Sequence, residues 1–80
     1  MKVKVRFFAR LKEEVGLSEV ELELDEGASL ADVIRAFLRE RDAGAILVAV
    51  NEELVEASDL RDVRLKDGDV VDVMPPASGG

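Results

Sequence analysis

The sequence predicts a small two-layer α+β domain in which one helix covers one face of a mixed sheet of about five strands. Several short segments alternate apolar and polar residues with the two-residue period of a strand, and one segment has helical spacing. The length of 80 residues suits a single domain. We expect residues 1–74 to form this domain and residues 75–80 to form an extended tail.

The first 24 residues predict two strands joined by a short helix. In residues 2–8 apolar and polar side chains alternate, so this strand buries one face. Residues 9–15 are rich in helix formers and end at Gly16, which suits a helical connection. Residues 19–24 alternate glutamate with valine or leucine, which predicts a second strand with an acidic outer face.

A turn at residues 25–27 precedes the main helix. Ser29 is a candidate N-cap, with Asp32 three residues later in the capping-box position. Three arginines suit the negative C-terminal end of the helix dipole: Arg35, Arg39 and Arg41. Apolar residues repeat at helical spacing on one face, which should pack on the sheet: Leu30, Val33, Ile34, Phe37 and Leu38.

The second half of the chain predicts three more strands. The apolar run 46–50 is too short for a helix and suggests a strand buried on both faces. A turn at residues 51–53 leads to a short strand at Leu54-Val55, and residues 59–65 form a connecting turn or one helical turn. Residues 66–69 then lead into a last strand at residues 70–74. This order of elements is that of the β-grasp fold, in which the first and last strands are parallel neighbours at the centre.

Composition limits the possible functions. The chain has 18 acidic and 11 basic residues and a net charge of −7, which disfavours direct binding to nucleic acid or anionic membranes and favours a basic protein partner. Cysteine and histidine are absent, which removes thiol nucleophiles, imidazole bases and the usual zinc sites. We therefore expect no bound cofactor, no metal and no autonomous active site. The abundant carboxylates are expected on the solvated surface, as at Glu13-Glu14, Glu52-Glu53, Asp67 and Asp69.

The sequence also suggests where the protein resides. Its longest apolar stretch, residues 43–50, is too short to cross a bilayer, and the N-terminal residues form an alternating strand with no signal-peptide core. We expect a cytoplasmic protein.

The last six residues are the candidate functional segment. Pro75 and Pro76 end the preceding strand and hold the chain extended, and they are followed by Ala77, Ser78, Gly79 and Gly80. Six extended residues reach roughly 20 Å, which is enough to enter a pocket on a partner. The other interpretation of the two glycines is a frayed end.

The chain resembles the small subunits of molybdopterin synthase, which are ubiquitin-like sulfur carriers. The resemblance covers essentially the whole length and lies in VKVRFFARL at residues 3–11, in Val50-Asn51, and in LKDGDVVDVMPPASGG at residues 65–80. The last segment is the most specific part. Met74 and Ala77 depart from it, since that family commonly has an aromatic residue and a valine there.

The resemblance implies a chemistry for Gly80. Its carboxylate would be adenylated by a separate ubiquitin-activating-type enzyme that uses ATP in trans, and a sulfur donor protein would then convert it to a thiocarboxylate. The large subunit, in a heterotetramer, would use this sulfur for the pterin precursor of the molybdenum cofactor. Gly79 would give steric access, because a Cβ so near the acyl carbon would crowd both enzymes. The chain has no GxxxxGK[ST] motif, in agreement with activation in trans.

A carrier must dock on its enzymes, and strand alternation predicts where. If Val3, Val5 and Phe7 face the helix, Phe8 faces away from it, and Met74 does the same on the last strand. The resemblance implies a large-subunit contact through Phe8, Leu54 and Met74, continued by the tail residues Pro75, Pro76, Ala77 and Ser78. The alternative is that Phe8 and Met74 fill a secondary core beneath a loop.

Three other functions stay open at this point. Sulfur carriers for thiamine synthesis or tRNA thiolation share the fold and the two glycines, although Pro75-Pro76 favours the molybdenum pathway. A modifier would pass the activated Gly80 to a lysine of a target protein. A non-covalent interaction or RNA-binding module would not use Gly80, and the acidity of the chain argues against RNA.

Overall fold

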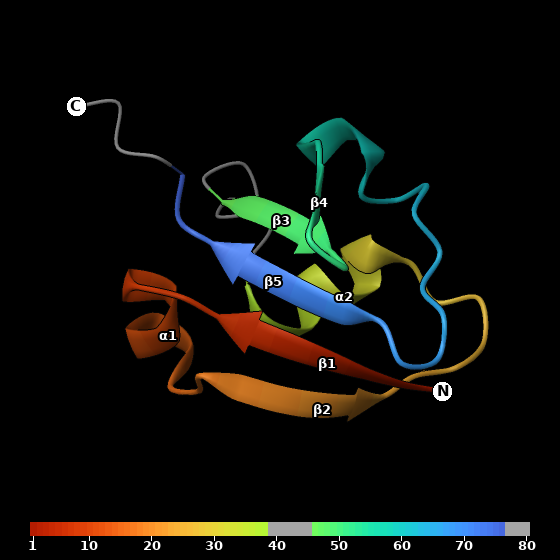
Figure 1. Ribbon diagram of the computed structural model, residues 1–80, viewed down its shortest axis with the longest axis horizontal. Coiled ribbons are helices and arrows are strands. Elements are labelled where there is room, and N and C mark those ends of the chain that lie inside the picture. The colour runs from red at the N-terminus through yellow and green to blue at the C-terminus, as the bar shows by residue number, and fades with distance from the viewer. Residues whose placement is uncertain (39–45, 77–80) are drawn as a thin grey trace.

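A computed structural model describes residues 1–38 and 46–76. These residues form a five-stranded mixed sheet in the order β2-β1-β5-β3-β4, with β1 and β5 parallel and the other neighbours antiparallel. Figure 1 views the sheet from the face opposite α2, so the helix lies behind the strands. The β-grasp architecture is confirmed. The elements are β1 (Lys2–Phe7), α1 (Arg10–Val15), β2 (Glu19–Glu23), α2 (Leu30–Phe37), β3 (Leu47–Val50), β4 (Glu53–Val55), the 3₁₀ turn η2 (Ala57–Asp59) and β5 (Val70–Met74).

The centre of the sheet is the parallel pair β1 and β5. Val5 lies opposite Val71, and Phe7 lies opposite Val73. All four side chains are buried against α2, as the alternation in β1 predicts. The two strands furthest apart in the sequence therefore form the middle of the core.

Helix α2 begins at the predicted cap. The Ser29 hydroxyl accepts a hydrogen bond from the Asp32 amide at 3.3 Å, and the Asp32 carboxylate accepts one from the Ser29 amide at 2.9 Å. The apolar face packs on the sheet, where Phe37 meets the edge of Phe7 with ring centroids 5.1 Å apart. Arg35 lies in the last helical turn, whereas Arg39 and Arg41 fall outside the described residues.

Helix α1 and strand β2 confirm the prediction for residues 9–24. Gly16 ends α1 at a φ of 86°, a left-handed conformation that favours glycine. In β2 the glutamates are exposed, while Val20 and Leu22 are half-buried against the core. Because β2 is an edge strand, its acidic side chains also discourage pairing with another chain.

The β3–β4 hairpin corrects one prediction. Leu47 is 39% exposed, so β3 is not buried on both faces, although Val48 and Ala49 are buried. The reason is that α2 covers only one face of the sheet, and Leu47 lies on the other face, opposite Met74. The turn at Asn51 and Glu52 has φ of 50° and 73°, the left-handed pair of a two-residue type I′ hairpin.

The connection from β4 to β5 differs slightly from the expected helical turn at residues 59–65. The helical turn is η2, which begins two residues earlier at Ala57, and Leu60 and Leu65 then anchor the segment in the core.

Asp69 is half-buried and is an exception to the expected solvated carboxylates, because its oxygens accept hydrogen bonds from Asn51 and the Lys66 amide. No helix in residues 1–38 or 46–76 is long and apolar enough to cross a membrane.

Candidate functional site

The predicted contact residues lie on the face of the sheet opposite α2, which we call the open face. Phe8 directly follows β1 and is 40% exposed, and its amide donates to the Val73 carbonyl at 3.1 Å. This bond holds Phe8 beside the end of β5, where Met74 is half-buried. Leu54 on β4 is 69% exposed. The structure therefore brings Phe8 and Met74 together, with Leu54 further along the same face.

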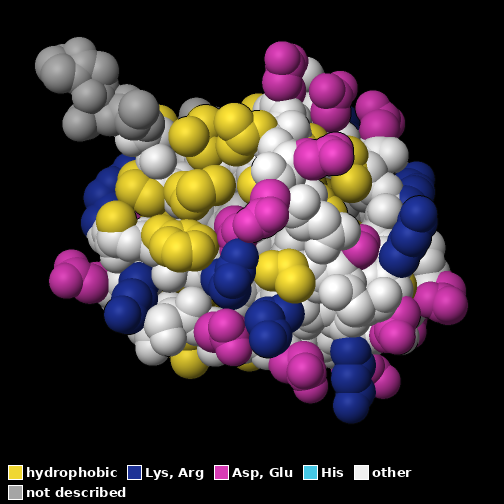
Figure 2. Space-filling model, viewed as in Figure 1, with side chains coloured by type: hydrophobic (Ala, Val, Ile, Leu, Met, Phe, Trp, Pro, Cys, Tyr) yellow, Lys and Arg dark blue, Asp and Glu magenta, His cyan; other side chains and the backbone are white. Residues whose placement is uncertain are grey.

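Leu47 also lies on the open face, although the sequence did not predict it as a contact residue. The strand register places Leu47 directly opposite Met74, and Leu54 opposite Ala49. We call Phe8, Leu47, Leu54 and Met74 the docking patch. Figure 2 shows hydrophobic side chains gathered on this face near the end of β5. An exposed apolar group of this kind, on one side of an otherwise charged surface, is typical of a protein-binding site.

An ion pair lies beside the docking patch. The Arg6 guanidinium donates from Nε to Asp72 Oδ1 at 2.6 Å and from Nη2 to Asp72 Oδ2 at 2.9 Å. Asp72 is only 8% exposed although it lies on the open face, because Arg6 covers it. The hydrogen bond to Asp72, assisted by its charge, raises the pKa of Arg6 above its ordinary value. The Arg6 Cζ also lies 5.9 Å from the centroid of the Phe8 ring.

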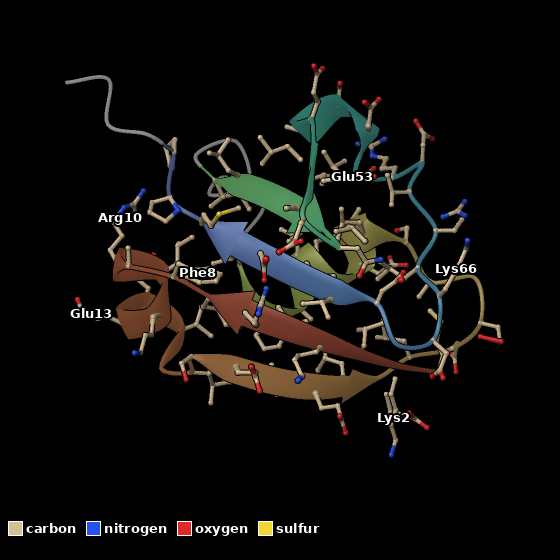
Figure 3. All side chains as sticks on the ribbon, in the orientation of Figure 1. Lys2, Phe8, Arg10, Glu13, Glu53 and Lys66 are labelled. Atoms are coloured by element: carbon tan, nitrogen blue, oxygen red, sulfur yellow. The ribbon has the colours of Figure 1, made fainter. Side chains whose placement is uncertain are left out.

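Beyond this ion pair the open face is charged. Lys2 and Lys4 on β1 lie opposite Glu23 and Glu21 on β2, and the Lys4 ammonium lies 3.8 Å from the Glu19 carboxylate. The labelled Lys2 and Phe8 in Figure 3 lie at opposite ends of β1, so the charged part of the open face and the docking patch lie toward opposite ends of this strand. The open face is thus divided into an apolar part and a part with alternating charges.

The base of the tail adjoins the docking patch. Met74 ends β5, Pro75 is half-buried and Pro76 is exposed. The other tail residues predicted to function, Ala77, Ser78, Gly79 and Gly80, lie outside the described residues. Because β5 is the middle strand of the sheet, the chain enters residues 75–80 from the centre of the fold, next to the patch.

The described surface has a hollow beside the β3–β4 hairpin. Among residues 1–38 and 46–76 no group of three or more carboxylates could hold a metal ion. The hollow has a volume of about 320 Å³ and has apolar and charged side chains in its lining, among them Leu54, Val55, Val63, Glu53, Arg64, Lys66 and Asp69.

Comparison with known proteins gives the family. The sequence profile of the ThiS family matches residues 5–80. The chain belongs to the ThiS family. The chain is 35% identical over 85 residues to a molybdopterin synthase sulfur carrier subunit from Chlamydomonas reinhardtii, with both chains covered completely. It is 34% identical over 92 residues to small archaeal modifier protein 3 from Haloferax volcanii, again over the whole of both chains.

Solved structures agree with this ThiS family assignment. A Pyrococcus furiosus protein described as subunit 1 of the molybdopterin converting factor is 38% identical, with a TM-score of 0.79 over 96% of this chain and 99% of that one. A Helicobacter pylori complex of subunits 1 and 2 of the molybdopterin-converting factor contains a chain that is 29% identical, with a TM-score of 0.68 and complete coverage of both. The resemblance to ubiquitin-like sulfur carriers predicted from residues 3–11 and 65–80 is confirmed.

Proposed function

We propose that this ThiS family protein is the sulfur carrier subunit of a molybdopterin synthase. The observation that carries the proposal is the position of the docking patch around the end of β5, the strand that continues into residues 75–80. A partner that covers Phe8, Leu47 and Met74 would also receive the tail. The full-length similarity to a molybdopterin synthase sulfur carrier subunit supports this function.

In this proposal Gly80 is the reacting residue. Its carboxylate oxygen attacks the α-phosphate of ATP on a ubiquitin-activating-type enzyme, which releases pyrophosphate and leaves an acyl adenylate. The terminal sulfur of a persulfide on a sulfur donor protein then attacks the acyl carbon, and AMP leaves. A thiol cleaves the S–S bond of the resulting acyl disulfide, which leaves a thiocarboxylate at Gly80 and a disulfide on the donor side. Gly79 gives both enzymes unobstructed access to the acyl carbon, because glycine has no Cβ.

The large subunit of the synthase is the proposed partner that receives the charged tail. The docking patch would bury its apolar side chains against that subunit, while Pro75, Pro76, Ala77 and Ser78 lead Gly80 into its pocket. The Helicobacter pylori complex of subunits 1 and 2 supports a partner of this kind. The charged part of the open face would stay at the rim, where ion pairs contribute little to affinity.

The charging reaction can be tested directly by mass spectrometry. The purified chain is incubated with its activating enzyme, ATP and a sulfur donor, and the intact mass is measured. We expect a gain equal to the difference between one sulfur and one oxygen atom, located in the C-terminal peptide. The variant lacking Gly80 is the matched control and should show no gain. An unchanged mass of the full chain under conditions that charge a known carrier would contradict the proposal.

A second candidate function is conjugation to other proteins. The 34% identity to small archaeal modifier protein 3 favours it, because both chains are covered completely. In that case the activated Gly80 would pass to a lysine amine of a target and form an isopeptide bond. Covalent adducts that disappear when Gly80 is deleted would support conjugation, whereas loss of the molybdenum cofactor in a deletion strain would support the synthase.

A further inference from the structure

Arg6, beside the docking patch, has guanidinium N–H groups that its hydrogen bonds to Asp72 do not use. A guanidinium carries five N–H groups in a planar fork. Asp72 takes one from Nε and one from Nη2, which uses the side of the fork. Within the described residues, Nη1 donates no hydrogen bond, so three N–H groups remain, and two of them point out of the end of the fork formed by Nη1 and Nη2.

Two contacts fix the orientation of this fork. The paired hydrogen bonds to Asp72 set its plane, and the Phe8 ring lies against it with 5.9 Å between Cζ and the ring centroid. Asp72 is itself held in the middle of the sheet, opposite Arg6 on β1 and Ala49 on β3. Arg6 is therefore preorganised, and little side-chain entropy remains to be lost when a partner binds.

Docking would change the surroundings of Arg6. A partner that covers Phe8 must also cover much of the guanidinium that lies against the Phe8 ring. The remaining N–H groups would then lose water, and a buried donor without an acceptor is costly. The partner must therefore supply oxygen acceptors at this point or bind weakly.

The charges around Arg6 indicate which acceptor fits. Asp72 already compensates the guanidinium, Glu19 lies opposite Arg6 but is paired with Lys4, and Glu52 adds further negative charge nearby. Arg6 and Glu52 also line the same hollow of about 300 Å³, together with Asn51 and Val70. A partner carboxylate would meet this excess of negative charge, whereas a neutral carbonyl oxygen would not.

We propose that Arg6 is a specificity-determining residue of the docking patch, which selects protein partners that place a neutral carbonyl oxygen on the Nη1–Nη2 end of its guanidinium. The carbonyl belongs to the backbone or to an asparagine or glutamine side chain. A partner whose matching surface is wholly apolar is rejected, because it would bury the remaining donors unsatisfied. This inference rests on the proposed function of the patch as the site that docks the synthase large subunit.

Two variants and one control test the proposal. Arg6→Lys keeps the charge but removes the fork, and the double variant Arg6→Leu with Asp72→Val replaces the pair by apolar residues and leaves no lone buried charge. Lys4→Met is the matched control, because Lys4 is a cation on the same face of β1 outside the docking patch. Thermal unfolding by circular dichroism establishes that each variant is folded.

Affinity is measured by calorimetry with the molybdopterin synthase large subunit encoded in the same genome. We expect Arg6→Lys and the double variant each to bind about tenfold or more weakly, and Lys4→Met to bind as the wild type does. The tenfold loss should be equal at about 0.05 M and about 0.5 M NaCl, because the acceptor is neutral. A loss that shrinks at high salt would indicate a partner carboxylate and overturn the proposal.

The remaining outcomes separate this inference from the proposed function. Undiminished binding by both Arg6 variants would overturn the inference about Arg6 and leave the proposed function of the chain standing. Failure of the wild-type chain to bind the large subunit would overturn the proposed function, and the inference with it.

Discussion

Asn51 and Asp69, which are 18 residues apart in the sequence, join the β3–β4 turn to the start of β5. The Asn51 Nδ2 donates to Asp69 Oδ1 at 3.0 Å, and Asn51 Oδ1 accepts from the Val70 amide at 3.0 Å. The Asn51 amide also donates to the Val70 carbonyl at 2.8 Å. One side chain thus holds the hairpin turn, which has a left-handed backbone at Asn51, against the central strand.

Replacing Asn51 should therefore lower stability in two separable steps. We expect Asn51→Ala to lower the free energy of unfolding by about 2 kcal/mol, because it loses the side-chain hydrogen bonds and strains a positive φ. Asn51→Gly loses the same bonds without the strain and should cost only about 1 kcal/mol. Urea unfolding measures both. Equal stability of the two variants would mean that the backbone strain is negligible.

The capping box of α2 predicts a dependence of stability on pH. The hydrogen bond that the Ser29 amide donates to the Asp32 carboxylate holds the pKa of Asp32 below its ordinary value of 3.8. A depressed pKa in the folded state adds stability above the unfolded-state pKa, and this stability is lost as the pH falls through the folded-state pKa. Asp32→Asn should thus melt at a lower temperature than the wild type at pH 7.

The difference in melting temperature between wild type and Asp32→Asn should narrow once the pH falls below about 4 and vanish in stronger acid. A series of thermal melts between neutral and acid pH measures it. Ser29→Ala is the companion variant, because it removes the hydroxyl acceptor of the Asp32 amide and keeps the carboxylate. A difference that stays constant down to the lowest pH would contradict a role for the ionised carboxylate.

The docking patch predicts a loss of binding without a loss of stability. Leu54 is 69% exposed, so Leu54→Ser should change the melting temperature little. It should weaken binding to the large subunit roughly ten- to a hundredfold, since burial of a leucine contributes about 1.5–3 kcal/mol. Leu17→Ser is the matched control, because Leu17 is also an exposed leucine and lies in the connection from α1 to β2, outside the patch. Equal weakening by both variants would indicate general hydrophobic association.

Charging and folding should be separable at Gly80. Among the residues that the structure describes, the buried core ends with Val73, seven positions before Gly80 in the sequence, so we expect deletion of Gly80 to leave this core intact. We expect the melting temperature to change by less than about 2 °C while the sulfur mass gain is abolished. Calorimetry and intact-mass measurement on the same preparation check both statements. A large fall in melting temperature would show that the terminal residue contributes to the fold.

The main elements of the fold could be predicted because local patterns determine them. Alternation in residues 2–8 identifies the buried face of β1, and Ser29 with Asp32 identifies the start of α2. The parallel pairing of the first and last strands followed from the order of elements, and the structure adds the register, with Val5 opposite Val71. For the strands, one face had to be buried, and this requirement determines which side chains point toward the core.

The docking patch could be predicted only in part. Phe8, Leu54 and Met74 were expected on the open face, but Leu47 lies in a continuous apolar run that has no period to separate its faces. Its exposure depends on what covers β3, which is a property of the assembled sheet. The Arg6–Asp72 pair likewise depends on a parallel register between residues 66 positions apart. The positive φ of Glu52 had no sequence signal, because glycine is the usual residue there.

The central position of β5 also has a mechanical consequence. An enzyme that draws residues 75–80 into its pocket pulls on β5 along the strand direction, and β5 is bonded to β1 on one side and β3 on the other. Such a load acts in shear on both ladders at once, whereas an edge strand would be held by a single ladder. We therefore expect the domain to withstand traction on its tail when a partner seats and releases it.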